Sequence, residues 1–167
     1  MRRPCPATGG TAPTRPCGFY PYTPATNLLF GLRAALDLLF EEGLANVFAR
    51  HRRHAEATRA AVHAWGLEVC CFDPREHSAS LTAVMMPAGH DEAAFRDVVY
   101  ERSGMSLASG LGKLKGRAFR IGHLGDFDDL HLIAALGGVE LGLAEAGVPH
   151  EPAGVAAALD VLRKSRA

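Results

Sequence analysis

The sequence predicts an α+β fold, in which a small and largely antiparallel sheet is covered by helices on one face. Two observations support this prediction. Apolar residues recur with helical spacing over residues 25–42 and 44–65, and after Gly66 the spacing shortens to the alternation typical of strands. The predicted elements then follow in the order helix, helix, strand, strand, helix, short strand, strand, helix, helix. This order groups the strands between flanking helices.

Glycines bound the first two predicted helices. Leu28 and Leu32 recur on one face of the first helix, which Gly43 ends, and Gly66 ends the second helix. Further along the chain, Asp126 is expected to cap the helix that runs to about residue 146. The remaining elements are predicted as strands over residues 67–72, 80–86, 105–107 and 117–122, and as helices over residues 91–103, 126–146 and 153–163.

The composition argues against several classes of function. Eighteen basic residues balance eighteen acidic ones among 167 residues, so the formal net charge is zero and a general nucleic-acid-binding surface is not expected. No apolar stretch reaches the roughly 20 residues that cross a bilayer, so we expect no membrane partner and a cytoplasmic location. The four cysteines lack the spacing of a zinc site or of a secreted disulfide framework. The length suits one domain or a piece of a larger one.

Eight histidines raise the question of a metal site, but simpler interpretations are favoured. His51 and His54 share a helix face with arginines that repel a cation, which favours a solvated helix face. His123 and His131 flank a run of aspartates, and helix capping explains two of these. The glycine-rich loop at residues 110–116 lacks the ending of a phosphate-binding loop. We therefore predict neither a metal site nor a nucleotide site.

Arg120 is the most informative single residue in the pattern. Alternation along its predicted strand places it on the face opposite Phe119 and Ile121, together with the small residues Ala118 and Gly122. An arginine with small neighbours has room to hold a carboxylate through two parallel hydrogen bonds. An arginine at a sheet edge, paired with an Asp or Glu, explains the same pattern.

Tyr20 and Thr23 form a second candidate pair. Both carry hydroxyl groups shortly before a predicted helix, and helix N-termini bind phosphate groups readily. An ordinary helix cap supplied by Thr23 explains the same position.

Taken together, several segments resemble the class V aminotransferases, and in particular their serine–glyoxylate and alanine–glyoxylate group. The resemblance extends over about residues 18–162 and rests on the order of the segments rather than on one motif. The matching segments are Phe19-Tyr20-Pro21-Tyr22-Thr23-Pro24-Ala25-Thr26-Asn27-Leu28-Leu29, Gly31-Leu32-Arg33, Glu42-Gly43-Leu44, Arg50-His51, Ala64-Trp65-Gly66-Leu67, Thr82-Ala83-Val84 with Pro87, Gly110-Leu111-Gly112, and Phe119-Arg120-Ile121-Gly122-His123-Leu124-Gly125.

This resemblance implies an enzyme that uses pyridoxal 5'-phosphate, belongs to fold type I of aspartate aminotransferase, and acts as a homodimer on amino acids and 2-oxo acids. The chain would correspond to its carboxy-terminal portion. Residues 1–18, rich in Pro and Gly, would be a disordered tail outside the family. Residues 19–43 would be a docking segment and helix from the end of the large domain, and residues 44–167 the small domain.

The resemblance also implies roles for the candidate residues. Tyr20 and Thr23 would bind the cofactor phosphate of the other subunit, and Arg120 would bind the substrate carboxylate. The Schiff-base lysine of the family lies upstream of the tyrosine segment, and no lysine precedes Tyr20 in this chain. No catalytic residue is therefore assigned, and we expect no transaminase activity from this chain alone. Without a large domain, the apolar face of the helix over residues 25–42 is expected to be exposed.

A hypothesis of another class stays open beside this one. The chain would then be a stand-alone α+β interaction module that pairs with a separate, lysine-bearing subunit, or a module that binds small carboxylates through Arg120.

Overall fold

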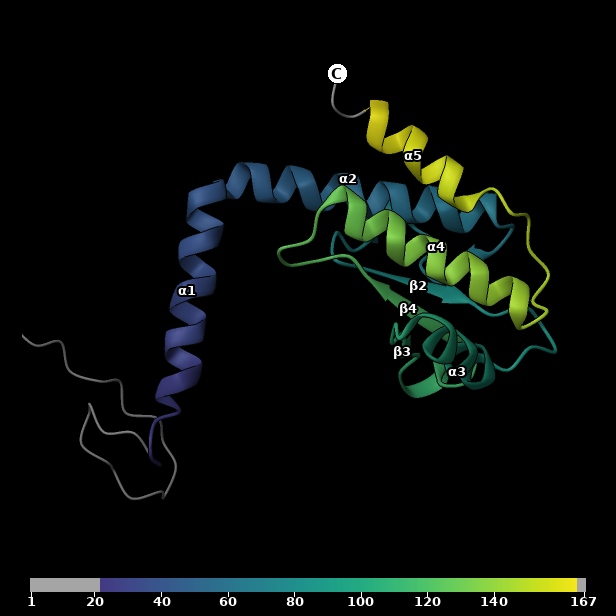
Figure 1. The fold of residues 1–167 in the computed structure, drawn as a ribbon, viewed down its shortest axis with the longest axis horizontal. Coiled ribbons are helices and arrows are strands. Elements are labelled where there is room, and N and C mark those ends of the chain that lie inside the picture. Colours follow the sequence, from purple (N-terminus) through teal and green to yellow (C-terminus); the bar gives the residue numbers. More distant parts are fainter. Residues whose placement is uncertain (1–21, 165–167) are drawn as a thin grey trace, which may run out of the picture. The chain divides into compact units, whose positions relative to one another are not determined.

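The computed structural model describes residues 22–164, and the chain divides between Gly43 and Leu44 into two units (Figure 1). The expected tail over residues 1–18 and the candidate residue Tyr20 lie outside the described range. In the first unit, helix α1 occupies Thr26–Glu42, as predicted from its periodicity. Among the helices of residues 22–164, none has both the length and the apolar character needed to cross a membrane.

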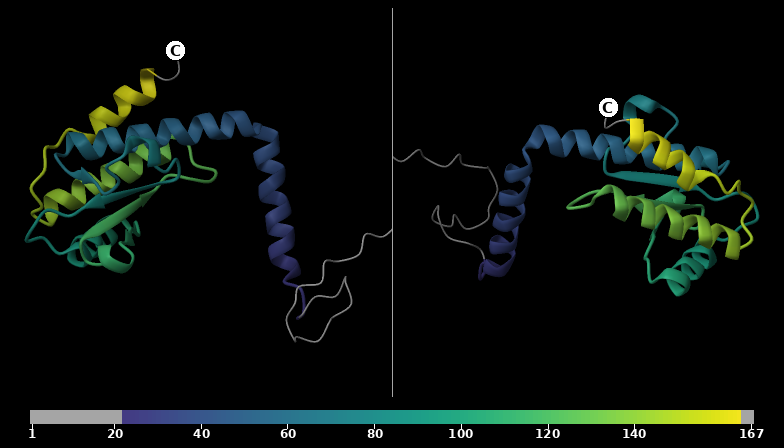
Figure 2. Two further views of the ribbon diagram at one scale, coloured as in Figure 1. Left: turned by 180° about the vertical axis from the view of Figure 1, so that it is seen from behind. Right: turned by 45° about the horizontal axis from the view of Figure 1, so that its top comes forward.

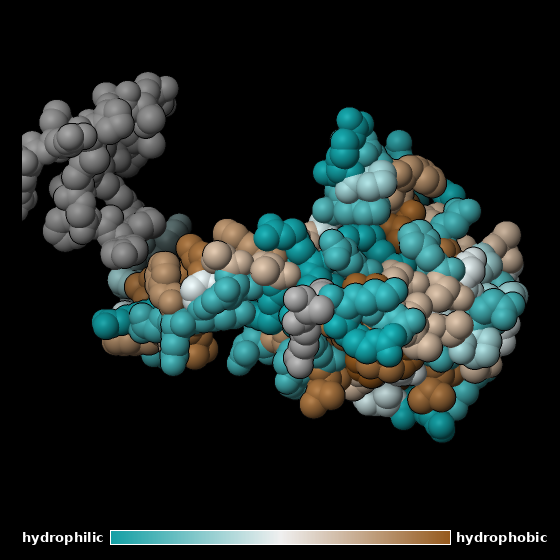
Figure 3. Space-filling view, turned by 90° about the horizontal axis from the view of Figure 1, so that it is seen from above, coloured by the Kyte–Doolittle hydropathy of each residue, from teal (hydrophilic) through white to brown (hydrophobic). Residues whose placement is uncertain are grey.

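Helix α1 has no buried residue. Apolar side chains are exposed on several sides of it, including Leu28 at 75%, Phe30 at 71% and Phe40 at 65% of their maximal area. Figure 3 shows apolar surface interspersed with polar surface on this helix. A helix that is apolar around most of its circumference is normally buried against other elements. The exposed patch predicted at Leu28, Leu32 and Leu39 is confirmed for Leu28 and Leu32, whereas Leu39 is only partly exposed.

The second unit contains a four-stranded antiparallel sheet with the order β1-β2-β4-β3. The strands are β1 (Glu68–Val69), β2 (Leu81–Met85), β3 (Ala108–Ser109) and β4 (Ala118–Gly122). In the central pair, Ala83 on β2 lies opposite Arg120 on β4, and Val84 lies opposite Phe119. The predicted α+β class, with a small antiparallel sheet and flanking helices, is confirmed.

Four helices complete this unit: α2, α3 and α4 cover one face of the sheet, and α5 packs on α2 and α4 (Figure 2). Strand side chains on this face, such as Val84, Phe119 and Ile121, are almost fully buried. The rings of Phe95 and Phe119 lie 4.8 Å apart between their centroids, which joins a helix to the central strand. The helices are α2 (Leu44–Ala64), α3 (Glu92–Ser103), α4 (Asp129–Glu145) and α5 (Gly154–Lys164), and the 3-10 turns are η1 (Pro74–Glu76) and η2 (Gly112–Leu114).

Close approach of two elements requires glycine at the start of α5. A Cβ atom added at Gly154 would lie 2.2 Å from Nε1 of Trp65, which is itself 1% exposed. The same indole nitrogen donates a hydrogen bond of 2.6 Å to Glu140 Oε2, and the backbone N–H of Val155 donates to that oxygen at 3.1 Å. Glu140 therefore ties the end of α2 to the first turn of α5.

Three sequence predictions need correction. The strand expected over residues 67–72 is shorter in the structure and comprises only Glu68–Val69, because the chain then turns away towards η1. The short strand expected over residues 105–107 is absent, and pairing with β4 begins at Ala108. Asp128 rather than Asp126 caps α4, accepting a hydrogen bond from the N–H of His131 at 2.8 Å. Phe127 packs against the core just before this cap, which delays the start of the helix.

Candidate functional site

Arg120 lies on the sheet face that the helices leave uncovered. Its strand β4 runs between β2 and β3, so the residue is not on an edge strand. Phe119 and Ile121 point into the core at 0% and 2% exposure, as alternation along the strand predicts. The residues opposite Arg120 in register are Ala83 on one side and Ala108 on the other. Small side chains therefore surround this arginine both along and across the strands.

Among residues 22–164, one nitrogen of the Arg120 guanidinium has a hydrogen-bond partner and the other two are available. Nε donates a hydrogen bond of 2.7 Å to the backbone carbonyl of Ser109. The hydroxyl of Ser109 in turn donates to Oε2 of the buried Glu92 at 3.3 Å, and Arg96 neutralises that carboxylate. Within residues 22–164, no carboxylate pairs with Arg120. The structure does not show the edge-strand ion pair considered as the alternative for this arginine.

The glycine-rich loop beside β3 has a tightly constrained backbone. A Cβ atom at Gly110 would lie 2.2 Å from the carbonyl oxygen of Leu114, and the N–H of Gly110 donates to the carbonyl of Ala118 at 2.7 Å. The loop continues as the turn η2, which contains Lys113 and is followed by Lys115, and both lysines are exposed. Glycine at residue 110 therefore sets the path of the chain next to the strand that carries Arg120.

Helix α2 holds the segment that follows β4. Arg50 donates from Nη1 to the carbonyls of Gly125 and Phe127 at 2.9 and 3.0 Å. The N–H of Gly125 donates to Nε2 of His51 at 3.3 Å. The sequence predicted a solvated face for this part of the helix, and the structure instead shows it bonded to a loop about 75 residues further along the chain.

Asp129 completes this attachment from the first turn of α4. One of its oxygens accepts from Arg53 Nη2 at 2.6 Å and from His54 Nε2 at 2.9 Å. His54 is fully buried, which corrects the expectation that it is solvated. Burial lowers the pKa of His54, and the hydrogen bond that it donates to Asp129 offsets this only in part. The spacing of His51 and His54 predicted that they share a helix face, but it did not predict that His54 bonds to Asp129.

His123, three residues after Arg120, is a second fully buried histidine. Its Nε2 lies 3.0 Å from the hydroxyl of Thr82 on β2. Burial lowers the pKa of His123 to about 4, so the ring is neutral at pH 7. No cluster of three or more His, Cys, Asp or Glu side chains suited to a metal occurs within residues 22–164. His123 is buried like Phe119 and Ile121 on the strand before it.

Thr23 is exposed, and it does not cap α1. Ala25 occupies the N-cap position, without a side-chain hydrogen bond, and the N–H of Thr26 donates to the carbonyl of Pro24 at 2.9 Å. The ordinary-cap interpretation of Thr23 is therefore wrong. Sequence reasoning also missed Ser109, which orients Arg120 through a backbone carbonyl and so has no side-chain signature.

Comparison with known proteins gives close relatives. The chain is 47% identical over 151 residues to serine–glyoxylate aminotransferase of Methylorubrum extorquens, covering 90% of this chain and 38% of the relative. It is 50% identical over 131 residues to the enzyme of the same name from Hyphomicrobium methylovorum, covering 78% of this chain and 32% of that one. The crystal structure of pyridoxamine–pyruvate aminotransferase from Mesorhizobium loti superimposes with a TM-score of 0.81 at 38% identity, covering 87% of this chain and 38% of that one.

The similarity covers most of this chain but only part of each relative. No family model matches the chain. The chain spans about a third of the length of the curated relatives that it matches. Its sheet and helices have the fold of the small domain of type I aminotransferases. Sequence and fold together identify the chain as a member of the class V aminotransferases, of the serine–glyoxylate and alanine–glyoxylate group, corresponding to the carboxy-terminal portion of these proteins.

Proposed function

We propose that this chain is the carboxy-terminal portion of a pyridoxal-phosphate-dependent transaminase that moves an amino group from serine or alanine to glyoxylate. The observation that carries the proposal is Arg120, with two guanidinium nitrogens available on the uncovered sheet face. Two relatives are named for serine and glyoxylate, which supports these substrates. We further propose that the chain alone does not catalyse the reaction.

In this proposal, Arg120 binds the carboxylate that amino acids and 2-oxo acids share. Because Nε is held by the Ser109 carbonyl, the plane of the guanidinium is fixed before a ligand arrives. A planar donor pair matches a carboxylate in two parallel hydrogen bonds. The alanines on both neighbouring strands leave the space that such a ligand needs.

The described residues do not complete a cofactor site. Pyridoxal phosphate, when bound, supplies an electron sink for the amino acid carbon. A lysine that reacts with it needs a desolvated position that lowers its pKa. Lys113, Lys115 and Lys164 are all exposed, so none has this environment. The roles of Tyr20 and Thr23 as phosphate ligands rest on the resemblance, and so does the homodimer.

A second candidate function is pairing with a separate, lysine-bearing subunit. The exposed apolar side chains of α1 favour it, because such a helix is stabilised by burial against another element. Both candidate functions place the cofactor-binding lysine on residues that this chain does not contain. They differ in whether that lysine lies on one longer polypeptide together with these 167 residues or on a separate subunit.

Activity measurements test the proposal in two steps. The purified chain with pyridoxal phosphate should show neither a cofactor–lysine absorbance band nor turnover of serine and glyoxylate. Mixing it with a separately expressed lysine-bearing portion of the Methylorubrum extorquens relative should restore turnover. Turnover by the chain alone would overturn the expected inactivity, and a folded but inactive mixture would count against the transaminase assignment.

Binding of glyoxylate to the chain alone tests Arg120 directly. Glyoxylate titrations followed by NMR should show at least tenfold weaker binding for Arg120→Lys, because a lysine cannot form the paired hydrogen bonds. Arg117→Lys, at an exposed arginine just before the same strand, should bind as the wild type does. Equal affinity of all three proteins would remove Arg120 from the site.

A further inference from the structure

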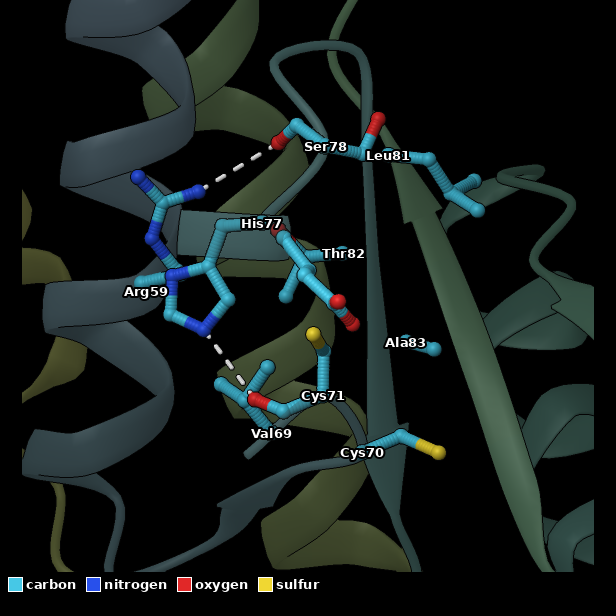
Figure 4. A pocket seen from close by; sticks show the side chains of 10 residues that line it. Arg59, Val69, Cys70, Cys71, His77, Ser78, Leu81, Thr82 and Ala83 are labelled. Carbon is cyan, nitrogen blue, oxygen red and sulfur yellow. Dashed lines mark hydrogen bonds between the residues drawn. The ribbon is translucent and has the colours of Figure 1, made fainter. Parts of the chain in front are cut away.

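A pocket of about 210 Å³ opens beside the first strands of the sheet, and Arg120 does not line it (Figure 4). Its walls come from α2, from the chain that leaves β1, from η1 and the residues after it, and from β2. Figure 4 shows Arg59 and His77 on one side of the pocket and Leu81 and Ala83 of β2 on the other. Most of the wall is apolar, with a few charged and polar groups.

Arg59 brings a cation into this pocket, and among residues 22–164 it forms no ion pair. The side chain is half-buried, and burial lowers the pKa of its guanidinium, which reflects a partly desolvated charge. The carboxylate of Glu56, one turn earlier on α2, acts in the opposite direction and offsets this only in part. Its hydrogen bond is long, 3.4 Å from Nη1 to the carbonyl of Ser78. Over the described part of the chain, no carboxylate lies within 4.0 Å of it. A partly desolvated guanidinium in this state is complementary to an anion.

Glu76 brings the opposite charge into the same pocket. It belongs to the turn η1 and lines the pocket together with Arg59. Among residues 22–164 it forms no ion pair, so these two opposite charges face one space without contacting each other. A ligand that carries both a carboxylate and an ammonium group complements both residues.

The wall between the charges limits what else the ligand carries. Val69 and the Cys71 thiol lie on the same side of β2 as Arg59 and His77, together with Thr82, whereas the side chains of Leu81 and Ala83 point to the other side of the strand (Figure 4). His77 donates from Nε2 to the carbonyl of Cys71 at 3.0 Å, which fixes the loop that closes the pocket. A short aliphatic side chain fits such a wall, whereas a charged one would be desolvated without a partner.

We propose that this pocket binds a small aliphatic α-amino acid, with its carboxylate at Arg59 and its ammonium group at Glu76. The site is separate from the one proposed at Arg120, although Ala83 contributes to the pocket wall and lies opposite Arg120 in register. The proposal does not depend on transamination, since it rests on the charges and walls of the pocket alone.

NMR titration of the full chain with L-alanine, propionate and ethylamine tests the proposal. L-alanine should shift the backbone amide signals of Cys71 and His77, with a dissociation constant in the millimolar range. Propionate and ethylamine each lack one of the two charged groups and should bind at least tenfold more weakly. If propionate binds as tightly as L-alanine, the pocket is a simple anion site and the proposal is wrong. If L-alanine shifts only signals around Arg120, the location is wrong.

Matched variants assign the two charges. Arg59→Gln and Glu76→Gln should each weaken L-alanine binding at least tenfold. Arg52→Gln on the exposed side of α2 and Glu101→Gln on the exposed side of α3 should leave it unchanged. Arg59→Lys keeps the cation and should retain part of the affinity, which separates loss of charge from loss of folding. Unchanged binding in Arg59→Gln or in Glu76→Gln would overturn the proposal.

Discussion

Helices α1 and α2 follow each other in the chain and differ in what surrounds them. Helix α1 has 17 residues, many of them large and apolar, and none is buried. Helix α2 has 21 residues, with many arginines and histidines, and seven of its residues are buried. Burial therefore follows from the partners that a helix has rather than from its apolar content. The partners of α2 are α5, α4, the sheet and the segment after β4, all within the second unit.

The largest expected difference between the two units concerns a pair of phenylalanines. Phe119 is 0% exposed in the core of the second unit, whereas Phe30 on α1 is 71% exposed. Phe119→Ala should lower the free energy of unfolding by about 3–5 kcal/mol, because it leaves a cavity. Phe30→Ala should change it by less than about 0.5 kcal/mol. Urea unfolding followed by circular dichroism measures both, and a large loss from Phe30→Ala would show that α1 is packed.

The bonds from Arg53 and His54 on α2 to Asp129 on α4 should stabilise the second unit almost as much as Phe119 does. Asp129→Asn removes the negative charge that Arg53 and His54 share, and leaves both groups poorly compensated. We expect a loss of about 2–3 kcal/mol in the free energy of unfolding. The matched change is Asp37→Asn on α1, whose ion pair with Arg33 spans 3.8 Å between exposed side chains. Equal small effects of the two variants would show that the attachment of α2 is no stronger than a surface ion pair.

Acid should destabilise the second unit through His123. Its pKa is lowered from 6.5 to about 4 in the folded state, so the unfolded chain binds this proton first as the pH falls. Its contribution to stability is therefore present above pH 6.5 and is lost as the pH falls towards 4. Between pH 7 and pH 5 this loss amounts to about 2 kcal/mol.

Variants separate this effect from the carboxylates that titrate in the same range. For His123→Gln, the free energy of unfolding should differ less between pH 7 and pH 5 than it does for the wild type. His131→Gln, at an exposed histidine, should retain the wild-type difference. The prediction fails if the two variants show the same dependence on pH. Burial also lowers the pKa of His54, which adds to the acid sensitivity in the same direction.

The contact of Gly154 with Trp65 predicts a smaller change in stability. Gly154→Ala would place a methyl group against the buried indole and should cost about 1–2 kcal/mol. Gly137 lies within α4 with open space around a Cβ atom, so Gly137→Ala should instead stabilise by about 0.5–1 kcal/mol. Thermal unfolding of both variants gives the comparison, and stabilisation by Gly154→Ala would show that α5 can move away from Trp65.

The sequence was sufficient where a pattern is local. Periodicity predicted the bounds of α1 and α2 to within one residue, and alternation correctly predicted that Arg120 and Phe119 point to opposite faces of the sheet. It was insufficient where a partner is distant. The bonds of His54 to Asp129 and of Arg120 to the Ser109 carbonyl join segments whose proximity depends on the whole fold. The short strand β3 was misplaced because two residues carry too little pattern to define a register.

The apolar surface of α1 should affect association more than folding. Leu32 and Leu36 lie four residues apart on one face and are 55% and 40% exposed. Replacing both with glutamine should reduce self-association in sedimentation experiments, because exposed apolar surface favours contact between molecules. The free energy of unfolding should change by less than about 0.5 kcal/mol. Arg33→Gln on the same helix serves as the control and should leave association unchanged. A loss of stability in the double variant, without a change in association, would mean that this face packs within the chain, and the contrast between α1 and α2 would no longer hold.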